Sequence, residues 1–343
     1  MTDDVVWVTG ATGFLAGGVL GELVRRGQRV VAFSRTPPPC TDGPVAWIVS
    51  DFTLEVLLEA SAAHGRPAHC FHGIGSGSVG LAAANPSADL ARTVGTLSIL
   101  LDALRHLGGS TRLVYPSSAA VYGDLGQDLA REERTLAPVS HYGLHKQLAE
   151  TVLAHAWNLD GIASRALRLF SIYGEGQRKL LLWDIGLRIL RGESPLSMDG
   201  TGNETRDYLH VADVARLVCD LMEAPWSGHD LLNAGSGEAT TVRSVAEGLA
   251  DALGYDVEVL FNGRTRPGNP QRLQADTGRL AATGFAPIIP FEEGLARYAA
   301  WLHWEHRNGV PNGMDHWAPR QAEPLVDIIS GQVEPDPFTR ERT

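Results

Sequence analysis

The chain has 343 residues, enough for one large domain or two smaller ones with a substantial core. Apolar residues make up 44% and charged residues 20% of a sequence that holds neither a bilayer-length apolar run nor a basic leader, so we expect a cytoplasmic globular protein and no membrane partner. A formal net charge of -11 argues against nucleic acid as the main partner, because phosphate binding needs a clustered positive field.

Short apolar runs alternate with segments of helical spacing through the first half of the chain. The expected strands are Val5–Val8, Val30–Phe33, Ala46–Val49, His69–His72, Arg112–Tyr115 and Ser164–Phe170. Helical spacing is found in Gly17–Arg26 and Leu90–Leu104, and a further helix carries Tyr142 and Lys146. Strands that alternate with helices predict an α/β fold: a parallel, doubly wound (Rossmann) sheet covered on both faces.

From about Gly174 the pattern changes to mixed helix and loop, with helices expected at Trp183–Arg191 and Val242–Leu253 and a late strand at Leu231–Asn233. We expect residues 1–173, with returning segments at about 206–238, to form a cofactor-binding domain. Residues 174–205 and 239–304 then form a smaller, interleaved, mixed α/β substrate-binding lobe. Residues 305–343 are rich in proline and polar residues, which predicts an extended C-terminal tail.

A glycine turn follows the first strand. Gly10, Gly13 and Ala16 have the spacing of a dinucleotide-binding turn, and they lie where a strand meets a helix, which is the context such a turn requires. The amide groups and the positive dipole at the start of the helix would receive the pyrophosphate. On this motif alone, an ordinary glycine loop is the alternative.

The residues after the second and third strands bear on the choice of cofactor. An NAD site usually has an acidic residue at the end of the second strand, where this chain has Ser34 followed by Arg35. A hydroxyl and a guanidinium suit the 2′-phosphate of NADP, so we prefer NADP to NAD, although Arg35 can also be a solvated strand-end residue. Asp51 and Phe52 are placed to bracket an adenine by hydrogen bond and apolar contact.

Tyr142 and Lys146 lie four residues apart, and Ser118 comes just after the expected fifth strand. On a helix, residues four apart share one face, so the Lys146 ammonium can lie beside the Tyr142 phenol and favour its ionisation. A phenol that titrates near pH 10 then becomes a usable acid or base, and the Ser118 hydroxyl would hold the substrate oxygen. Tyr-x-x-x-Lys spacing also occurs by chance on surface helices, so the surroundings decide.

Three cysteines, Cys40, Cys70 and Cys219, are widely separated and lack Cys-x-x-Cys spacing. Neither a disulfide framework nor a metal site is therefore expected, and the thiols are interpreted as buried or incidental. His72, His141 and His145 are bases by type, but a lone histidine is more often structural or solvated.

Over roughly residues 5 to 302 the sequence resembles the extended short-chain dehydrogenase/reductase family, which includes nucleotide-sugar epimerases, dehydratases and ketoreductases. The motifs that carry the resemblance are Gly10-x-x-Gly13-x-x-Ala16, Asp51-Phe52, Ser117-Ser118-Ala119-Ala120-Val121-Tyr122-Gly123, Tyr142-x-x-x-Lys146, Arg168-Leu169-Phe170-Ser171-Ile172-Tyr173-Gly174, Arg206-Asp207-Tyr208-Leu209-His210-Val211 and Arg266-Pro267-Gly268-Asn269. Together and in this order they are specific.

The resemblance implies roles for individual residues. The implied catalytic residues are Ser118, Tyr142 and Lys146. The implied cofactor-binding residues are Gly10, Thr12, Gly13, Phe14, Leu15, Ser34, Arg35, Asp51, Phe52, Gly73, Ile74, Tyr142, Lys146 and Phe170. The implied substrate-binding residues are Ser76, Ser118, Tyr142, Ser171, Arg206 and Arg266, with the two arginines on the diphosphate of a nucleotide sugar. It also implies a homodimer packed as a four-helix bundle that includes the Tyr142 helix, with His155 and Trp157 either interface or core residues.

Departures from the family pattern decide between reactions. Hexose dehydratases typically carry Thr-Asp-Glu where this chain has Ser118-Ala119-Ala120, so the acid and base for eliminating water are missing. Galactose-type epimerases keep NAD bound and have an acidic residue at the position of Ser34, whereas Arg35 favours a reductase. Ser171 and Arg92 replace frequent asparagines, and the glycines of Gly73–Gly77 either open room for a sugar or accommodate a close loop.

The preferred hypothesis is therefore an NADPH-dependent reductase of a nucleotide-linked 4-keto-6-deoxy sugar. Tyr142 would protonate the C4 oxygen as general acid, Lys146 would orient the nicotinamide ribose, and Ser118 would position the oxygen. The alternative is a nucleotide-sugar 4-epimerase with tightly bound NAD. A non-catalytic dinucleotide sensor is a third hypothesis. The presence of both Tyr142 and Lys146 argues against it, because a sensor would be expected to lose one of them.

Overall fold

Seven parallel strands form the central sheet of the computed structural model, which describes residues 4–38, 43–264 and 270–308. The strands lie in the order β11-β6-β5-β4-β1-β2-β3. Their bounds are β1 Val5–Thr9, β2 Arg29–Ser34, β3 Val45–Val49, β4 Pro67–His72, β5 Arg112–Ser118, β6 Ser164–Leu169 and β11 His229–Ala234. The predicted doubly wound α/β sheet is confirmed, and the expected late strand is its edge strand β11.

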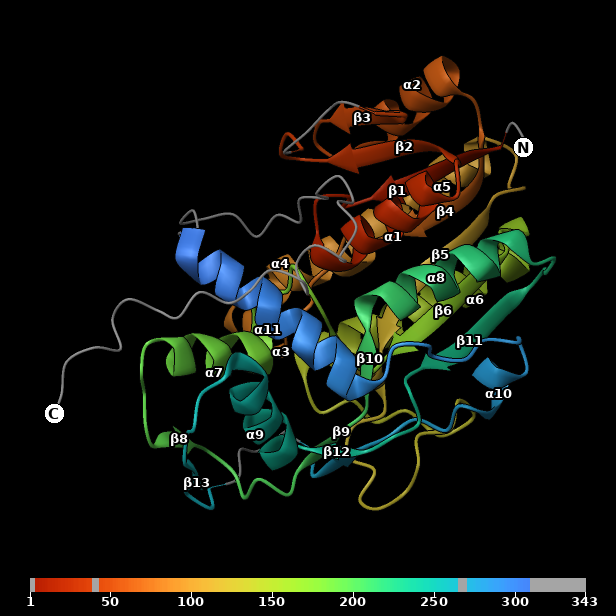
Figure 1. Ribbon diagram of the computed structural model, residues 1–343. Coiled ribbons are helices and arrows are strands. Elements are labelled where there is room, and N and C mark those ends of the chain that lie inside the picture. The colour runs from red at the N-terminus through yellow and green to blue at the C-terminus, as the bar shows by residue number, and fades with distance from the viewer. Residues whose placement is uncertain (1–3, 39–42, 265–269, 309–343) are drawn as a thin grey trace, which may run out of the picture.

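Helices cover both faces of the sheet (Figure 1), and each face packs against its own apolar core. Helices α1 (Phe14–Arg25) and α8 (Val211–Glu223) pack on one face, and α2 (Leu54–His64), α5 (Thr96–His106) and α6 (His141–Asp160) pack on the other. Strands buried on both faces explain the near-continuous apolar run Val5-Val6-Trp7-Val8, since no residue of such a strand faces water.

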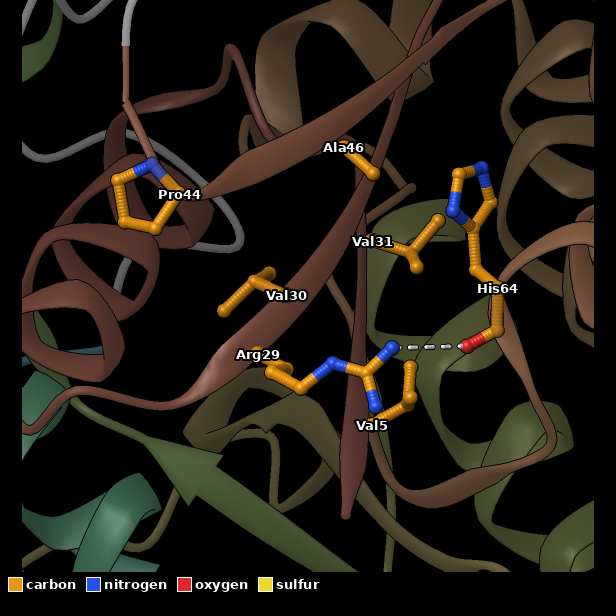
Figure 2. A pocket seen from close by; sticks show the side chains of 7 residues that line it. All are labelled: Val5, Arg29, Val30, Val31, Pro44, Ala46 and His64. Carbon is orange, nitrogen blue, oxygen red and sulfur yellow. Dashed lines mark hydrogen bonds between the residues drawn. The ribbon is translucent and has the colours of Figure 1, made fainter. Parts of the chain in front are cut away.

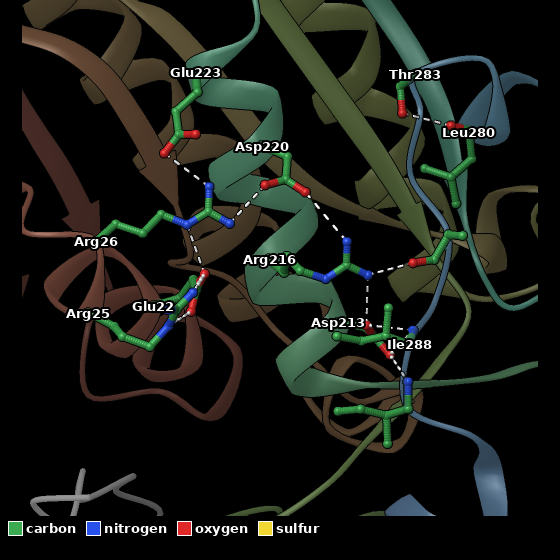
Figure 3. Close-up of polar contacts among 12 residues, drawn as sticks. Glu22, Arg25, Arg26, Asp213, Arg216, Asp220, Glu223, Leu280, Thr283 and Ile288 are labelled. Atoms are coloured by element: carbon green, nitrogen blue, oxygen red, sulfur yellow. Dashed lines mark hydrogen bonds and ion pairs between the residues drawn. The ribbon is translucent and has the colours of Figure 1, made fainter.

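Ion pairs join α1 and α8 along their outer surface (Figure 3). The Arg26 guanidinium, at the end of α1, lies 2.8 Å from Glu22, 2.8 Å from Asp220 and 3.0 Å from Glu223. Arg216 of α8 donates to Asp213 at 2.9 Å. Of these contacts, those of Arg26 with Asp220 and Glu223 join α8 to the helix that begins at the glycine turn.

A third core joins α7, α9 and α11 with residues of the short strands β7, β8, β10 and β13. These three helices lie on the side toward which the β2 and β3 arrows point in Figure 1. The remaining elements are α3 Val79–Ala84, α4 Pro86–Leu90, a π-helical turn Ala91–Gly95, a 3-10 turn Ala119–Val121, β7 Ser171–Tyr173, α7 Leu180–Leu190, β8 Leu196–Met198, β9 Thr205–Arg206, β10 Tyr208–His210, β12 Thr240–Thr241, α9 Val242–Leu253, β13 Val259–Phe261, β14 Arg272–Leu273, α10 Gly278–Ala281 and α11 Phe291–Asn308. The assignment of cofactor and substrate to separate parts of the chain stays a prediction, because packing alone assigns no ligand.

Three expectations about individual segments need correction. The expected helix Leu90–Leu104 is divided into α4, the π-helical turn and α5. Ser117 and Ser118 belong to β5 instead of following it, because their backbone pairs with β6 up to Leu169. Helix α11 runs to Asn308, past the expected start of the tail at 305, and residues 309–343 lie outside the described residues. Cys70 and Cys219 are buried, as expected, and Cys40 lies outside the described residues.

A shallow pocket of about 80 Å³ lies at the amino ends of β1 and β2 (Figure 2). Its lining includes Val5, Arg29 and Ala46, and the Arg29 guanidinium donates to the His64 carbonyl at 3.5 Å. This edge of the sheet is opposite to the one that carries the predicted site residues. Of the helices in the described ranges, none is both long and apolar enough to cross a membrane.

Candidate active site

The predicted site residues come together at the carboxyl edge of the sheet. Because the strands are parallel, β1, β2, β4 and β5 all end at this edge, and the β1 residue Thr9 is in register with Phe33 of β2 and His72 of β4. The chain order reverses between β1 and β4, which is where open parallel sheets bind ligands. The fold thus gathers residues that are far apart in the sequence.

The glycine turn after β1 lies directly against the loop after β4. Gly10 has a φ of +65°, and a Cβ added to it would lie 3.0 Å from the carbonyl carbon of Gly73 and 3.1 Å from the Ile74 nitrogen. Only glycine permits this close approach. Three predicted cofactor-binding residues, Gly10, Gly73 and Ile74, are therefore in contact.

The start of α1 presents its backbone to the same edge. Thr12 lies buried in the turn, Gly13 is the N-cap, and Phe14 and Leu15 form the first turn of the helix. Among the described residues, no side chain caps this helix and no acidic residue occupies its first turn. Free amide groups and an uncompensated positive dipole suit a pyrophosphate, so the residues present fit a dinucleotide.

The residues after β2 and β3 line the far end of this edge. Ser34 is buried and donates its hydroxyl hydrogen to the Thr36 carbonyl at 2.6 Å, whereas Arg35 and Asp51 are exposed. The Phe52 ring packs against Phe33, with centroids 6.2 Å apart. The Phe52 ring can therefore form an apolar side of the adenine site, and the exposed Arg35 side chain is accessible to a ligand.

Helix α6 begins beside the end of β5. The Ser140 hydroxyl caps the helix by accepting from the Gly143 amide at 3.1 Å. A Cβ on Gly143 would lie 2.4 Å from the Ala120 carbonyl oxygen, so glycine alone lets α6 approach the turn that follows Ser118. A hydrogen bond joins the Ser118 and Tyr142 side chains. The structure therefore brings Ser118 and Tyr142 together, with Lys146 one helical turn further along.

Lys146 is a buried ammonium, with 3% of its surface exposed. Its Nζ donates to the Pro116 carbonyl at 2.7 Å and to the Tyr115 hydroxyl at 3.3 Å, and it lies 5.9 Å from the centroid of the Tyr142 ring. Burial lowers the pKa of Lys146 to about 8, against an opposing effect of the Asp89 and Glu150 carboxylates. The group therefore titrates close to neutral pH.

The ionisation of Tyr142 differs from the expectation. Burial raises the pKa of Tyr142 above its ordinary value, and the hydrogen bond with Ser118 offsets only part of that rise. We expected the Lys146 ammonium to favour the ionised phenol, but its nitrogen faces Pro116 and Tyr115 and desolvation dominates.

The predicted substrate-binding residues lie on neighbouring segments. Ser76 follows β4, and the Ser171 amide donates to the Asp207 carbonyl at 2.8 Å, which places Ser171 next to Arg206. The Arg206 guanidinium donates to the Thr205 carbonyl at 2.7 Å, and burial lowers its pKa. Phe170 is buried directly after β6. Arg266 lies outside the described residues.

Two buried polar groups lie near the site, of which sequence analysis named the histidines but not Asp89. His72 lies between the hydroxyls of Thr9 at 2.9 Å and Thr96 at 3.2 Å, and burial lowers its pKa to about 3, which confirms a neutral structural histidine. Asp89 pairs with His145, which lies 56 positions later in the sequence, and no short-range sequence pattern predicts such a pair. In the described ranges there is no cluster of three metal-ligating side chains.

Comparisons with known proteins agree with this fold. The model of the NAD dependent epimerase/dehydratase family matches residues 6–235. The UDP-glucose 4-epimerase of Azospirillum brasilense is 31% identical over 339 residues, which cover 90% of this chain and 96% of that protein. A putative UDP-glucose 4-epimerase of Methanocaldococcus jannaschii is 26% identical over 311 residues, covering 88% of this chain and 100% of that protein.

Among solved structures, the UDP-glucose 4-epimerase of Thermus thermophilus in complex with NAD superposes with a TM-score of 0.78. The two are 26% identical, and the match covers 87% of this chain and 99% of that one. From the family match, the near full-length relatives and the shared sheet, we conclude that the chain belongs to the NAD dependent epimerase/dehydratase family, within the extended short-chain dehydrogenases/reductases.

Proposed function

We propose that this protein is a UDP-sugar 4-epimerase that uses NAD. The observation that carries the proposal is the meeting of Ser118, Tyr142 and Lys146 at the carboxyl edge of the sheet, the edge that also carries the glycine turn. Two relatives that align over nearly their whole length are named as a UDP-glucose 4-epimerase and a putative one, and a structurally similar UDP-glucose 4-epimerase was solved in complex with NAD. They favour the epimerase over the reductase that the sequence alone suggests.

Each residue of the site has a defined task in this reaction. NAD, held by the glycine turn and by Lys146, would supply a reversible acceptor for the C4 hydride. Tyr142 takes the proton from the C4 hydroxyl during oxidation and returns a proton to the C4 oxygen in the reverse step. Ser118 hydrogen-bonds that oxygen, while Arg206 and Arg266 bind the diphosphate. Since the hydride and a proton both return to the sugar, with the hydride on the opposite face of C4, the net change is in the configuration at C4 alone.

An NADPH-dependent reductase of a nucleotide-linked 4-keto-6-deoxy sugar is the second candidate. It is favoured by one feature, the exposed Arg35 next to the uncharged Ser34, which stands at the strand end where an NAD site usually has a carboxylate. The same Tyr142 would then act as general acid. Nothing at the carboxyl edge favours a non-catalytic dinucleotide sensor, since the tyrosine and lysine are both retained.

Cofactor content and turnover separate the two reactions. We would denature the purified full-length protein, identify any released nucleotide, and assay UDP-glucose conversion to UDP-galactose with no cofactor added. The epimerase predicts released NAD and conversion without added cofactor. A protein that carries no NAD, does not convert UDP-glucose or a related UDP-sugar, and oxidises NADPH with a nucleotide 4-keto-6-deoxy sugar is a reductase.

We also propose a homodimer in which α5 and α6 of two copies form a four-helix bundle. Leu144, Leu148 and Leu159 of α6 are exposed large apolar residues, and Leu144 and Leu148 are one turn apart on the same face. Trp157, further along α6, is also exposed, which favours an interface role over a core role.

Light scattering tests this interface. We expect a dimeric mass for the wild type, a monomeric mass for Leu148→Asp, and an unchanged dimer for the control Ile288→Asp, whose side chain is exposed outside α5 and α6. A monomeric wild type, or a Leu148→Asp variant that stays dimeric, contradicts the proposal.

A further inference from the structure

A buried carboxylate lies close to the candidate catalytic pair without belonging to it. Asp89 of α4 and His145 of α6 are each 5% exposed, and His145 Nδ1 lies 2.5 Å from Asp89 Oδ2. The other oxygen, Oδ1, is buried and has no hydrogen-bond partner among the described residues. Because burying a carboxylate is costly, a half-satisfied one beside a candidate active site calls for a reason.

The titratable groups around Asp89 come mainly from two elements. Helix α6 contributes His141, Tyr142, His145 and Lys146, and β5 contributes Tyr115. The neighbouring helix α3 has no titratable residue in its sequence, and Arg92 of the π-helical turn is exposed. The negative charge of Asp89 raises the pKa of Lys146, Tyr142 and Tyr115, so it reaches every ionisable group of the candidate pair.

Glu150 is the other carboxylate that acts on Lys146, but its charge is paired with a guanidinium. The Arg168 guanidinium binds it at 2.8 Å, and the Ser117 hydroxyl donates to it at 2.5 Å. Lys146 itself donates to two neutral oxygens, the Pro116 carbonyl and the Tyr115 hydroxyl. A buried ammonium with only neutral acceptors needs a nearby negative charge, and Asp89 is the carboxylate that binds no guanidinium in the part of the chain that the structure describes.

We propose that Asp89 and His145 form a positioning unit of the Tyr142–Lys146 site, in which His145 anchors the Asp89 carboxylate and that carboxylate keeps the Lys146 ammonium charged. The inference rests on the proposed roles of Tyr142 and Lys146. His145 holds the carboxylate through Oδ2 and leaves Oδ1 without a competing partner. Neither residue contacts the reacting atoms, so their effect is on the charge of the pair.

The substitution Asp89→Asn tests the charge directly, because it keeps an oxygen acceptor for His145 and removes the negative charge. We expect the alkaline limb of the kcat/KM profile for UDP-glucose to move down by about one pH unit, since Lys146 loses its proton earlier. Asp89→Glu should keep the limb of the wild type. The matched control is Asp102→Asn on α5, which removes an exposed carboxylate paired with Arg105 and should leave the profile unchanged.

A second measurement needs no substrate and so separates this inference from the proposed reaction. The difference in tyrosinate absorbance between the wild type and Tyr142→Phe reports Tyr142 alone. In the Asp89→Asn background that difference should appear about one pH unit lower than in the Asp89 background. If epimerase activity is absent but this midpoint still shifts, the proposed function fails and the positioning unit stands.

Two results overturn the inference. One is a folded Asp89→Asn protein, by circular dichroism, whose tyrosinate midpoint and alkaline limb equal those of the wild type. The other is an equal change in Asp89→Asn and Asp89→Glu, which would mean that the side chain matters for packing alone. If Asp89→Asn does not fold, Asp89→Gln against Asp89→Glu gives the same comparison of charge at one side-chain length.

Discussion

At the scale of single residues, Lys146 is a group of the candidate site whose charged form is disfavoured by burial. Its pKa falls from an ordinary 10.5 to about 8, so the folded protein binds this proton less tightly than the unfolded chain does. The contribution of Lys146 to the free energy of unfolding is therefore fully present only above about pH 10.5, and it is lost as the pH falls through about 8. The site keeps a charge that folding disfavours, which is what a functional ammonium requires.

This difference makes a stability prediction for Lys146→Met, a substitution that removes the titrating group. The free energy of unfolding of the wild type, relative to that of the variant, should rise by up to about 3 kcal/mol between pH 8 and pH 10.5. Urea denaturation at a series of pH values measures it. A pH-independent difference contradicts the account of a desolvated ammonium.

The residues that sequence alone can identify are those with a local signature. Tyr142 and Lys146 share a helix face, and Gly10 and Gly13 follow a strand at a recognisable spacing. Asp89 and His145 have no such signature, because a tertiary contact between α4 and α6 creates the pair. The preference for NADP also rests on a local feature, the single residue Arg35. The related structure solved with NAD does not support that preference.

At the scale of elements, the register of α6 against the end of β5 sets the distance between Ser118 and Tyr142. Gly143→Ala places a methyl group 2.4 Å from the Ala120 carbonyl, so the start of α6 must move. We expect a loss of about 1–3 kcal/mol in the free energy of unfolding and a fall of about 10²-fold in kcat. Gly95→Ala is the control, since a Cβ there meets nothing within 4 Å. Equal activity of both variants contradicts this role for Gly143.

A buried network ties α6 to β6. The Arg168 guanidinium binds the Glu150 carboxylate, the Tyr122 hydroxyl at 3.0 Å and the Glu132 carbonyl at 2.9 Å. Arg168→Met leaves the Glu150 charge unpaired and should cost about 3–5 kcal/mol in chemical denaturation. Arg134→Met, which breaks the exposed pair with Asp128, should change stability little. A similar small effect of both substitutions would mean that the buried pair does not hold α6.

Element boundaries follow the sequence where periodicity is strong and depart from it where tertiary contacts intervene. The strands and α9 lie close to their expected positions because their apolar patterns are regular. The prediction of a single regular helix over Leu90–Leu104 was wrong, because the apolar spacing of this segment does not reveal the π-helical turn. Helix α8 was not expected from sequence, although its packing against α1 explains its apolar face.

At the scale of the whole molecule, the candidate site exists only because the sheet is parallel and reverses its order between β1 and β4. That topology brings the ends of β1, β2, β4 and β5 to one edge and sets α6 beside them. Each of these strand ends is marked by a short motif, so the order of the motifs along the chain is enough to identify the family and its fold. The reaction depends on few side chains at this edge. Sequence reasoning therefore identified the fold, while the triplet stays a prediction and the preferred reductase is supported less than the epimerase.

The most direct test of the central claim is 4-epimerisation by Tyr142→Phe compared with the wild type. We would follow UDP-glucose conversion to UDP-galactose by the full-length protein with no cofactor added, and use Tyr255→Phe, a half-exposed tyrosine stacked on His303, as the matched control. The account predicts turnover by the wild type and Tyr255→Phe, and a fall of about 10²–10⁴-fold for Tyr142→Phe. Turnover by a folded Tyr142→Phe protein at the wild-type rate would contradict it.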